Sequence, residues 1–451
     1  MTAIFLLCYE HEDVKVDMKQ ENPISSADLE FLSNTNLFAA VQNASMTSLL
    51  NSLNFRHVKA GERFIIQGEE GDRFYIIQNG SCIINVEKDS NINRVACLKS
   101  GDVVGEMAVV TGEHRSSHVD AETDMDLWSL TRKQFDSLSR EFPDLRNFLT
   151  EIVAQRFSSS KITADRTIGK YTIHEVLDQG AWSIVYKGLH DVLNYPVALK
   201  MLKHTMAMDP EFSEKFRNEA KTIARLNHPN IVRIYDIEER YRTLFIIMEF
   251  LEGFSLKYML MNKPKPSLSG SLDIILQVCS GLAYAHKQGI IHQDIKPANI
   301  FIQPDGQVKI VDFGLSCSQG NIDFDMPGTP YYMSPEQIQG EPVDERTDIY
   351  SLGIVVHELL TGQRPFPEGR IGKLLDLHVK EDTPDPRSLV PDLPEELRSV
   401  IMNSVRRIPS ERFNNVSEVI NELQPLAEKL ELKYHSLPGK REQNDGVITL
   451  L

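Results

Sequence analysis

The chain contains little cysteine, and its cysteines are not spaced for metal binding. Only five of 451 residues are cysteine. No two of them form a Cys-x-x-Cys pair, and an odd number cannot pair completely. The scarcity excludes a disulfide scaffold, so we expect reduced thiols in a cytoplasmic protein.

Long apolar runs and an excess of basic charge are also missing. No stretch reaches the ~18–20 apolar residues of a membrane span, and the opening MTAIFLLCYE lacks the basic start of a signal peptide. Acidic residues outnumber basic ones by 64 to 48, which gives a net charge of −16. We therefore expect no membrane span and no nucleic-acid partner, and an anionic ligand would need a local basic pocket.

What the chain does contain indicates several folded units. Its 451 residues allow two to four domains at ~100–200 residues each, and no repeat or low-complexity block interrupts them. From about 36 to 135, short β-rich runs such as RFYIIQ alternate with turn glycines, which predicts a small all-β roll or barrel. The following residues, 130–159, have apolar positions at helical spacing.

One stretch of this β region, GEMAVVTGEHRSS at 105–117, has the composition of a phosphate pocket. Arg115 can direct two N–H donors at phosphate oxygens, and backbone amides of the turn can add more. Glu106 could accept a hydrogen bond from a ribose hydroxyl. A single phosphate attached to a sugar would suit these groups.

The stretch resembles the phosphate-binding cassette of cyclic-nucleotide-binding domains, and the resemblance extends over roughly residues 36–157. It implies that Gly105, Glu106, Met107 and Ala108 line the ribose, that Arg115 and Ser116 hold the cyclic phosphate, and that Ser117 stands where Ala is usual. The ligand would be cAMP or cGMP, with Ser116 slightly favouring cAMP. The alternative is a cassette kept for its fold without a ligand.

The stretch from Ile290 to Leu315, IIHQDIKPANIFIQPDGQVKIVDFGL, carries chemistry of another kind. Asp305-Gly306 predicts a hairpin turn between two short strands, with a polar loop at each outer end. The hard oxygens of Asn299 and Asp312 suit Mg²⁺ bound to phosphates. Asp294 lies where an acidic group could orient a hydroxyl nucleophile.

These loops resemble the His-Arg-Asp and Asp-Phe-Gly motifs of eukaryotic-type protein kinases, here His292-Gln293-Asp294 with Asn299, and Asp312-Phe313-Gly314. The resemblance covers about residues 171–425 and implies an α+β bilobal fold. It further implies that Asn299 and Asp312 hold Mg²⁺ or Mn²⁺ and that Asp294 orients the acceptor. Lys296 would support the γ-phosphate and favours Ser or Thr as acceptor.

Further landmarks imply an ATP site and a substrate platform. Lys200 in VALK and Glu219 in the next predicted helix match the ion pair that positions ATP. Residues 328–336 (GTPYYMSPE) resemble the substrate platform, Asp348 matches a buried helix acid, and Arg412 is the expected partner of Glu336. The ATP-binding residues implied by the resemblance are Leu177, Gly180, Val185, Ala198, Lys200, Glu249 and Leu251.

Two departures from the kinase pattern shape the functional hypothesis. The glycine-rich loop keeps only Gly180 of three glycines, with Asp178 and Ser183 at the other two positions, which predicts a working but slow loop. Gln293 replaces the Arg that usually binds a phosphorylated activation loop, so we expect control by the cyclic-nucleotide module instead.

The resulting hypothesis is a cyclic-nucleotide-regulated Ser/Thr protein kinase that uses ATP to phosphorylate protein substrates. The fold class is multidomain: an all-β roll with flanking helices, then a kinase fold. The alternative is a pseudokinase scaffold without phosphotransfer; a nucleotide-gated transcription factor is disfavoured because no helix-turn-helix follows the β region. The expected boundaries are a poorly ordered leader at 1–30, the nucleotide-binding domain at 31–157, a linker at 158–168, the kinase domain at 169–426 and a tail at 427–451.

Overall fold

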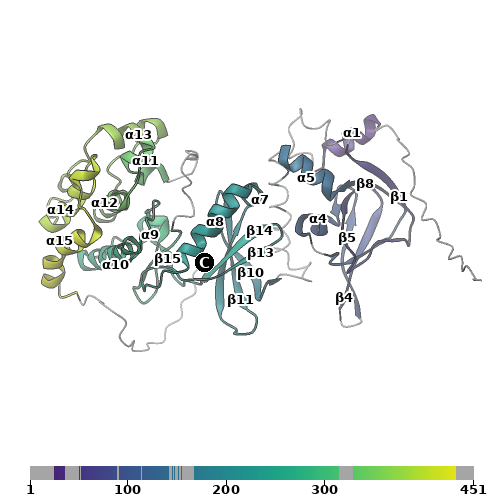
Figure 1. Ribbon diagram of the computed structural model, residues 1–451, viewed down its shortest axis with the longest axis horizontal. Helices are drawn as coiled ribbons and strands as arrows, with labels where there is room; N and C mark the ends of the chain where they lie inside the picture. The colour runs from purple at the N-terminus through teal and green to yellow at the C-terminus, as the bar shows by residue number, and fades with distance from the viewer. Residues whose placement is uncertain are drawn as a thin grey trace, which may run out of the picture. The chain divides into compact units, whose positions relative to one another are not determined.

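The computed structural model describes residues 25–35, 50, 52–88, 91–112, 114–141, 145, 147, 151, 154, 167–313 and 329–432. The chain divides into two compact units, Met1–Phe148 and Leu149–Leu451 (Figure 1). Each unit has its own sheets and helices.

The N-terminal unit is built on two four-stranded antiparallel sheets with the orders β1-β8-β3-β6 and β2-β7-β4-β5. Apolar side chains from both sheets, including Tyr75, Ile77 and Val119, form one core between them. On β7 the intervening Asp120 pairs instead with Arg63 of β2 at 2.6 Å, as expected when alternate residues face opposite sides of a sheet. The strands are β1 (Asn54–Val58), β2 (Arg63–Ile65), β3 (Arg73–Asn79), β4 (Ser81–Lys88), β5 (Asn91–Lys99), β6 (Val103–Val104), β7 (His118–Ala121) and β8 (Met125–Thr131).

Three described helices accompany these sheets: α1 (Ser26–Ser33), α4 (Glu106–Thr111) and α5 (Arg132–Glu141). A capping box between Ser25 and Asp28 starts α1. The short helix α4 lies between two left-handed glycines, Gly105 (φ 78°) and Gly112 (φ 75°). Because such φ values are strained for other residues, these glycines fix where α4 begins and ends.

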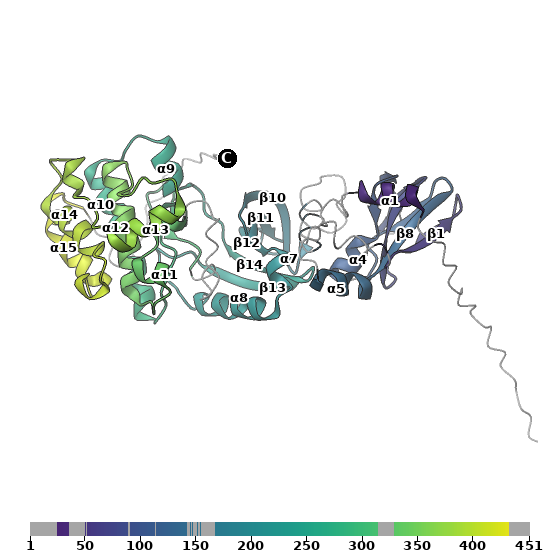
Figure 2. The same cartoon turned by 90° about the horizontal axis from the view of Figure 1, so that it is seen from above.

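The second unit begins with a small lobe, a six-stranded sheet of order β13-β14-β12-β11-β10-β9. Helix α7 (His204–Ala207) and helix α8 (Pro210–Ile223) follow β12, and α8 runs along the sheet beside β13 (Figure 2). Asp209 caps α8 by accepting from two backbone amides, and Pro210 occupies its first position. The strands are β9 (Thr167–Ile168), β10 (Tyr171–Gln179), β11 (Ser183–His190), β12 (Pro196–Leu202), β13 (Ile234–Arg240) and β14 (Thr243–Glu249).

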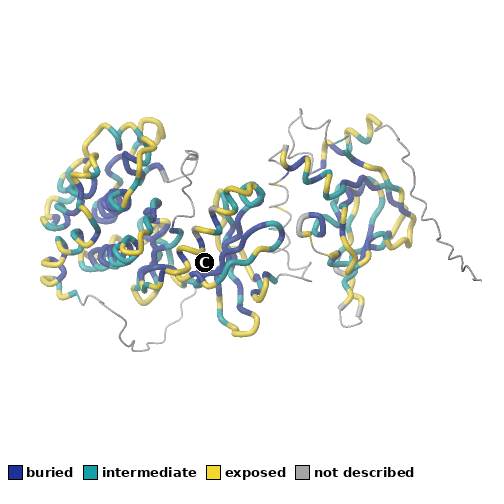
Figure 3. Tube along the Cα trace, viewed as in Figure 1, coloured by how far each residue is buried: buried dark blue, intermediate teal, exposed yellow. Residues whose placement is uncertain are grey.

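The large lobe is mainly helical, and its central helices are the most buried. Helix α10 (Leu268–Lys287) and helix α12 (Glu345–Thr361) carry ten and thirteen buried residues, respectively, and appear dark blue in Figure 3. The other elements are α9 (Leu256–Asn262), α11 (Pro335–Gln339), α13 (Ile371–Lys380), α14 (Glu395–Ser404), α15 (Val416–Lys429), the strands β15 (Phe254–Ser255), β16 (Ile300–Ile302) and β17 (Val308–Ile310), and the 3-10 helices η1 (Pro297–Asn299), η2 (Thr329–Tyr332), η3 (Pro386–Ser388) and η4 (Pro409–Glu411).

Helix α10 also bears on the expectation that no segment spans a membrane. Among the described residues it is one helix that is long and apolar enough to cross a bilayer by length and composition. More than half of its most apolar stretch is buried inside the unit. The helix therefore packs as a core helix in this fold.

One continuous core joins the two lobes of the second unit. It extends from Ala198 of β12 and Phe216 of α8, through Leu256, to residues of α10, α12, α14 and α15. Burial of apolar surface at ~25 cal/mol per Å² makes such a shared core the main force that holds both lobes together. The candidate site lies where β12 and the β16–β17 hairpin meet across it.

Candidate functional site

The β16–β17 hairpin brings the two polar loops together. Its strands pair antiparallel with Ile300 opposite Ile310, and the predicted turn contains Gly306 at φ 82°. In an antiparallel hairpin the residue before the first strand lies beside the residue after the second. Accordingly, the amide of Val311 donates to the carbonyl of Asn299 at 2.9 Å, and Asp312 comes next.

Asp312 is bound directly by Lys200. The Lys200 Nζ donates to Asp312 Oδ1 at 2.7 Å, and Lys200 itself is buried on the central strand β12. Burial opposes ionisation of Asp312, but the charge of Lys200 and its hydrogen bond outweigh that effect and hold the pKa of Asp312 below its ordinary value. Asp312 is therefore a carboxylate at neutral pH, in contact with a buried cation.

Asp294 is held in one orientation by its neighbours in the same loop. The Asn299 side-chain amide donates to Asp294 O at 2.8 Å and to Asp294 Oδ2 at 2.9 Å. Lys296 Nζ lies 2.7 Å from the same Oδ2. Three of the predicted residues thus form a single cluster around one carboxylate.

A buried carboxylate of helix α12 accepts hydrogen bonds from this loop and stabilises it. Asp348 of α12 is fully buried and accepts from the amides of His292 (2.8 Å) and Gln293 (2.7 Å) and from His286 Nε2 (2.7 Å). Gln293 has the left-handed φ of 65°, which is unfavourable for a residue other than glycine. The bonds to Asp348 stabilise that strained backbone.

His292 connects the two loops. Its Nδ1 accepts from the Asp294 amide at 3.2 Å, so its Nε2 carries the proton that is donated to Val311 O at 3.0 Å. The ring also packs against Phe313, with centroids 4.5 Å apart. The position of Asp294 is therefore coupled to that of Asp312.

The donor set fits one divalent cation bound together with phosphates. Because the Asn299 amide nitrogen is used on Asp294, its Oδ1 faces the other side and accepts no hydrogen bond within the described residues. No group of three or more His, Cys, Asp or Glu forms a metal cluster in the described part of the chain. Asn299 and Asp312 would leave most coordination positions to phosphate and water, as is usual for Mg²⁺.

The predicted nucleotide-binding residues lie on the small lobe and on the segment that follows β14. Ala198 is buried in the shared core, Val185 and Leu251 pack against that core, and Leu177 is exposed. Glu249 Oε2 accepts from the buried Lys309 at 2.8 Å, a contact that the sequence did not indicate. The side chain of Glu219 lies outside the described residues, so its expected pairing with Lys200 stays a prediction.

Gly180 shows how the altered glycine-rich loop is built. Its amide donates to Ser183 O at 2.9 Å, which closes the turn between β10 and β11. A Cβ added at Gly180 would meet nothing closer than 3.6 Å. The turn itself therefore does not require glycine here.

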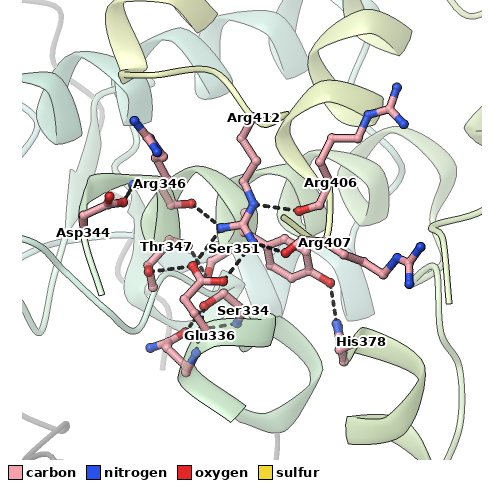
Figure 4. A network of polar contacts seen from close by, with 12 residues as sticks. Ser334, Glu336, Asp344, Arg346, Thr347, Ser351, His378, Arg406, Arg407 and Arg412 are labelled. Carbon is pink, nitrogen blue, oxygen red and sulfur yellow. Dashed lines mark hydrogen bonds and ion pairs between the residues drawn. The ribbon is translucent and has the colours of Figure 1, made fainter. Parts of the chain in front are cut away.

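The predicted ion pair between Glu336 and Arg412 is present and buried (Figure 4). Arg412 donates to both carboxylate oxygens of Glu336 at 2.8 Å, and Thr347 donates to the same group at 2.8 Å. Burial raises the pKa of Glu336, but the bond and charge of Arg412 prevail and hold it below the ordinary value. The remaining Arg412 donors bind the carbonyls of Arg346, Arg406 and Arg407.

This network fixes the segment that resembles a substrate platform. Ser334 and Gln337 form a capping box that starts α11, and Gln337 Nε2 donates to Gln293 O at 2.8 Å. The segment is therefore tied both to the buried Glu336 pair and to the loop of Asp294. Residues 314–328, which include Gly314 and Gly328, lie outside the described residues.

In the N-terminal unit, Arg115 lies in a cradle of backbone. Its two terminal nitrogens donate to Gly105 O and Arg73 O, each at 2.7 Å, and the residue is buried. A Cβ at Gly71 would come within 2.8 Å of Arg115 Nε, and one at Gly105 within 2.7 Å of Arg115 Nη1. Glycine is needed at both positions, because a side chain would occupy the space around the guanidinium.

The other predicted cassette residues surround this cradle. Glu106 and Met107 begin α4, Ala108 is buried against Gly71, and Ser116 and Ser117 are half-buried before β7. Burial lowers the pKa of Arg115, while Tyr75, Asp72 and Glu106 favour its charged form. One buried cation beside small residues fits a single phosphate.

Two contributors to the cradle were missed from the sequence. Gly71 packs against both Ala108 and Arg115, and Arg132 at the start of α5 donates to Ala108 O. The run EEGDRFY contains a glycine just before a strand, a weak signal for close backbone approach. For Arg132 the sequence offered no signal, since a basic residue at a helix start is usually exposed.

Two family models match the chain. A model described as "Protein kinase domain" matches residues 171–423, which is more than half of the chain. A model described as "Cyclic nucleotide-binding domain" matches residues 55–142. The two matches fall in the second and the first unit, respectively.

Three curated relatives are similar to the C-terminal unit. A probable serine/threonine-protein kinase of Clostridium acetobutylicum is 36% identical over 258 residues, which are 56% of this chain and 39% of that protein. PrkC of Bacillus subtilis is 35% identical over 259 residues, 56% of this chain and 40% of its own. PknL of Mycobacterium tuberculosis is 33% identical over 276 residues, which are 60% of this chain and 69% of that protein. The chain spans about two fifths of the length of the first two relatives.

Proposed function

The chain belongs to the protein kinase family, within its serine/threonine kinases, and from this premise we propose that it is an active kinase regulated by a cyclic nucleotide. The proposed enzyme transfers the γ-phosphate of ATP to Ser or Thr hydroxyls of protein substrates. The regulatory module spans 31–157 and the catalytic one 169–426, joined by 158–168. We place the protein in the cytoplasm.

In the proposed mechanism the chain's own residues position both reactants. Lys200 orients the phosphates of ATP, and Asp312 with Asn299 would hold Mg²⁺, which neutralises phosphate charge when bound. Asp294 accepts a hydrogen bond from the substrate hydroxyl and orients it for attack on the γ-phosphorus. Lys296, already 2.7 Å from Asp294, offers its positive charge to the transferred group.

The observation that carries this proposal is that the loops of Asp294 and Asp312 lie together and that each carboxylate is held by a lysine. Asp312 is bound by a buried Lys200 at 2.7 Å, and Asp294 is fixed by Asn299 and Lys296 within 2.9 Å. A scaffold without phosphotransfer has no need for an aligned acceptor-orienting carboxylate. The retained set therefore favours catalysis over the pseudokinase alternative.

A phosphotransfer assay tests both halves of the proposal. The full chain is incubated with Mg·ATP and a generic Ser/Thr protein substrate, without nucleotide and with cAMP or cGMP, beside an Asp312→Ala variant. We expect transfer that is lost in the variant and that one nucleotide changes. Transfer indifferent to both nucleotides would remove the regulatory half, and its absence under every condition would favour the scaffold.

The regulatory half makes a prediction about Arg115. Arg115→Ala removes the buried guanidinium, so we expect the nucleotide response to vanish while basal phosphotransfer is kept. Arg94→Ala is the matched control, because Arg94 lies on the surface of the same unit and forms a single exposed ion pair there, with Glu122 at 3.5 Å. Titration of labelled cAMP and cGMP, together with the phosphotransfer assay, measures the effect. An unchanged response in Arg115→Ala would contradict the pocket assignment.

A further inference from the structure

Arg364 lies against the platform segment, and both its backbone and its side chain are held in place. Helix α12 ends at Thr361 and is capped by Gly362, which has a left-handed φ of 80°. The carbonyl of Gln363 is then bound by Thr361 Oγ1 at 2.8 Å and lies 3.0 Å from His357 Nδ1. Arg364 follows, and Pro365 after it restricts its backbone.

The side chain of Arg364 lies directly over η2. Its guanidinium carbon is 3.8 Å from the centre of the Tyr331 ring, a stacked arrangement that guanidinium groups favour. Its Nε is 3.4 Å from Glu358 Oε1. Tyr332, the other aromatic residue of η2, donates to Glu358 Oε2 at 2.5 Å.

In this cluster the guanidinium group of Arg364 is more exposed to solvent than the carboxylate of Glu358. The Arg364 side chain is 36% exposed, whereas that of Glu358 is 14% exposed. Both Glu358 oxygens are already used, one by Arg364 and one by Tyr332. Within the described residues the two terminal nitrogens of Arg364 donate no hydrogen bond, and its shortest ion-pair contact is made by Nε.

We propose that Arg364 reads an acidic side chain of the protein substrate, close in sequence to the acceptor hydroxyl. The inference rests on the proposed kinase function and names the substrate class of the same site. Terminal guanidinium nitrogens form paired hydrogen bonds to a carboxylate. The stack on Tyr331 and the fixed backbone orient Arg364 before binding, which lowers the entropy cost of recognition.

The same geometry argues against a basic recognition sequence. A substrate Lys or Arg would need a free carboxylate at the platform, and Glu358 is covered by Arg364 and Tyr332. Ala298, next to Asn299 in the catalytic loop, adds no charge. The platform therefore offers a cation rather than an anion to the peptide.

The test compares peptides that differ in one side-chain group, the carboxylate of Asp or the neutral amide of Asn. A Ser-containing peptide carries Asp or Asn at each position flanking the acceptor in turn, and kcat/KM is measured for the full chain. We expect one position at which Asp is preferred roughly fivefold, the size of a good partly exposed ion pair. The preference should decline as salt is added.

Variants then assign that preference to Arg364. Arg364→Gln should abolish the Asp preference while keeping the rate on the Asn peptide, and Arg364→Glu should prefer a Lys peptide at the same position. Arg370→Gln is the matched control, because Arg370 is 78% exposed and pairs with Glu368. Equal losses on both peptides in Arg364→Gln would show a merely structural role and overturn the inference.

The outcomes also separate this inference from the proposed function. Phosphorylation of Asp and Asn peptides at equal rates, unaffected by Arg364→Gln, would overturn the acidic preference and leave the kinase in place. A preference for phosphoserine but not for Asp would likewise overturn the proposal as stated. No phosphorylation of any peptide or protein would overturn both.

Discussion

At the residue scale, two of the six described non-glycine residues with a left-handed backbone lie in the loops of the candidate site. Gln293 and Asp312 have φ values of 65° and 60°, and each such residue costs about 1–3 kcal/mol. Both are held by strong partners, the Asp348 carboxylate for Gln293 and Lys200 for Asp312. Each of the two loops that carry the proposed chemistry therefore contains one strained residue that a charged partner stabilises.

Asp348 gives a direct test of that support. Asp348→Ala would leave the buried donor of His292 and the partly buried donors of Gln293 and His286 without their acceptor. We expect a loss of roughly 3–5 kcal/mol in the free energy of unfolding, measured by urea denaturation. Asp376→Ala is the control, since Asp376 pairs with Lys380 on the surface and should cost less than about 0.5 kcal/mol. Similar losses in both variants would contradict the argument.

Asp294 tests the catalytic role without disturbing the fold. Asp294→Asn keeps the shape of the side chain, which Asn299 can still approach, but removes the negative charge beside Lys296. We expect phosphotransfer to fall by roughly 10²–10⁴-fold, the usual contribution of such a group. A rate within tenfold of the unsubstituted chain, at unchanged thermal stability, would argue against this role.

The sequence predicted the residues that sit in short motifs better than those that act across the fold. Asp294, Lys296, Asn299 and Asp312 lie together because fixed spacing in one hairpin determines their geometry. The positions of Arg132 and Arg364 depend on helices and turns far away in the sequence. A lone arginine in a polar segment carries no local signal of which carbonyl or ring it will meet.

At the element scale, helix α5 is tied to helix α4 by one side chain. Arg132 Nη2 donates to Ala108 O of α4 and lies 3.4 Å from Gly71 O, while its amide donates to Asp72 O at 2.6 Å. A cation at the carbonyl end of a short helix is favourable. The contact gives a physical route by which a ligand at the cassette could act on α5.

Arg132→Gln should therefore loosen α4 without unfolding the unit. We expect faster hydrogen exchange of the α4 amides and a weaker response of kinase activity to nucleotide, with basal activity unchanged. Arg140→Gln, on the same helix and outside this contact, is the matched control. Unaltered exchange in α4 together with a normal nucleotide response would show that Arg132 does not couple these elements.

The elements were predictable where their residue patterns are local. Turn glycines located the β region, and Asp209-Pro210 marks the start of α8 as capping rules expect. The pairing of β2 with β7 and of β4 with β7 was not predictable, because it joins segments about 35 to 60 residues apart. The predicted helix at 130–159 corresponds to α5 up to Glu141, and most later residues lie outside the described part.

At the scale of the whole molecule, the order of the two units was predictable because each carries its own motifs. Arg115 and its glycines belong to one unit, and Lys200, Asp294 and Asp312 to the other. The proposed regulation of the second unit by a ligand in the first has no comparable motif, because coupling between folded units leaves no fixed spacing of residues in the sequence.

Burial lowers the pKa of several histidines of the C-terminal unit, and we expect the two with the largest shifts, His378 and His204, to make its stability depend on pH. Burial lowers the pKa of His378 to about 4, with a backbone contact at Tyr331 acting in the opposite direction, and burial lowers that of His204 to about 4. Between pH 6.5 and 4 these two histidines are protonated in the unfolded chain but remain neutral in the folded chain. The free energy of unfolding should therefore fall in this window, by about 1.4 kcal/mol per pH unit for each histidine.

His378→Gln isolates one of these contributions. A glutamine can still hydrogen-bond to Tyr350 OH, which lies 2.8 Å from His378 Nδ1, but it does not titrate. Urea denaturation at pH 7, 6 and 5 should give a shallower fall in this variant, by the share of one proton, because the contribution of His378 is removed while those of the other buried histidines remain. The exposed His57 provides the control as His57→Gln. If His378→Gln and the unsubstituted chain lose stability in parallel, the buried imidazole is not the group that sets the acid limit of this unit.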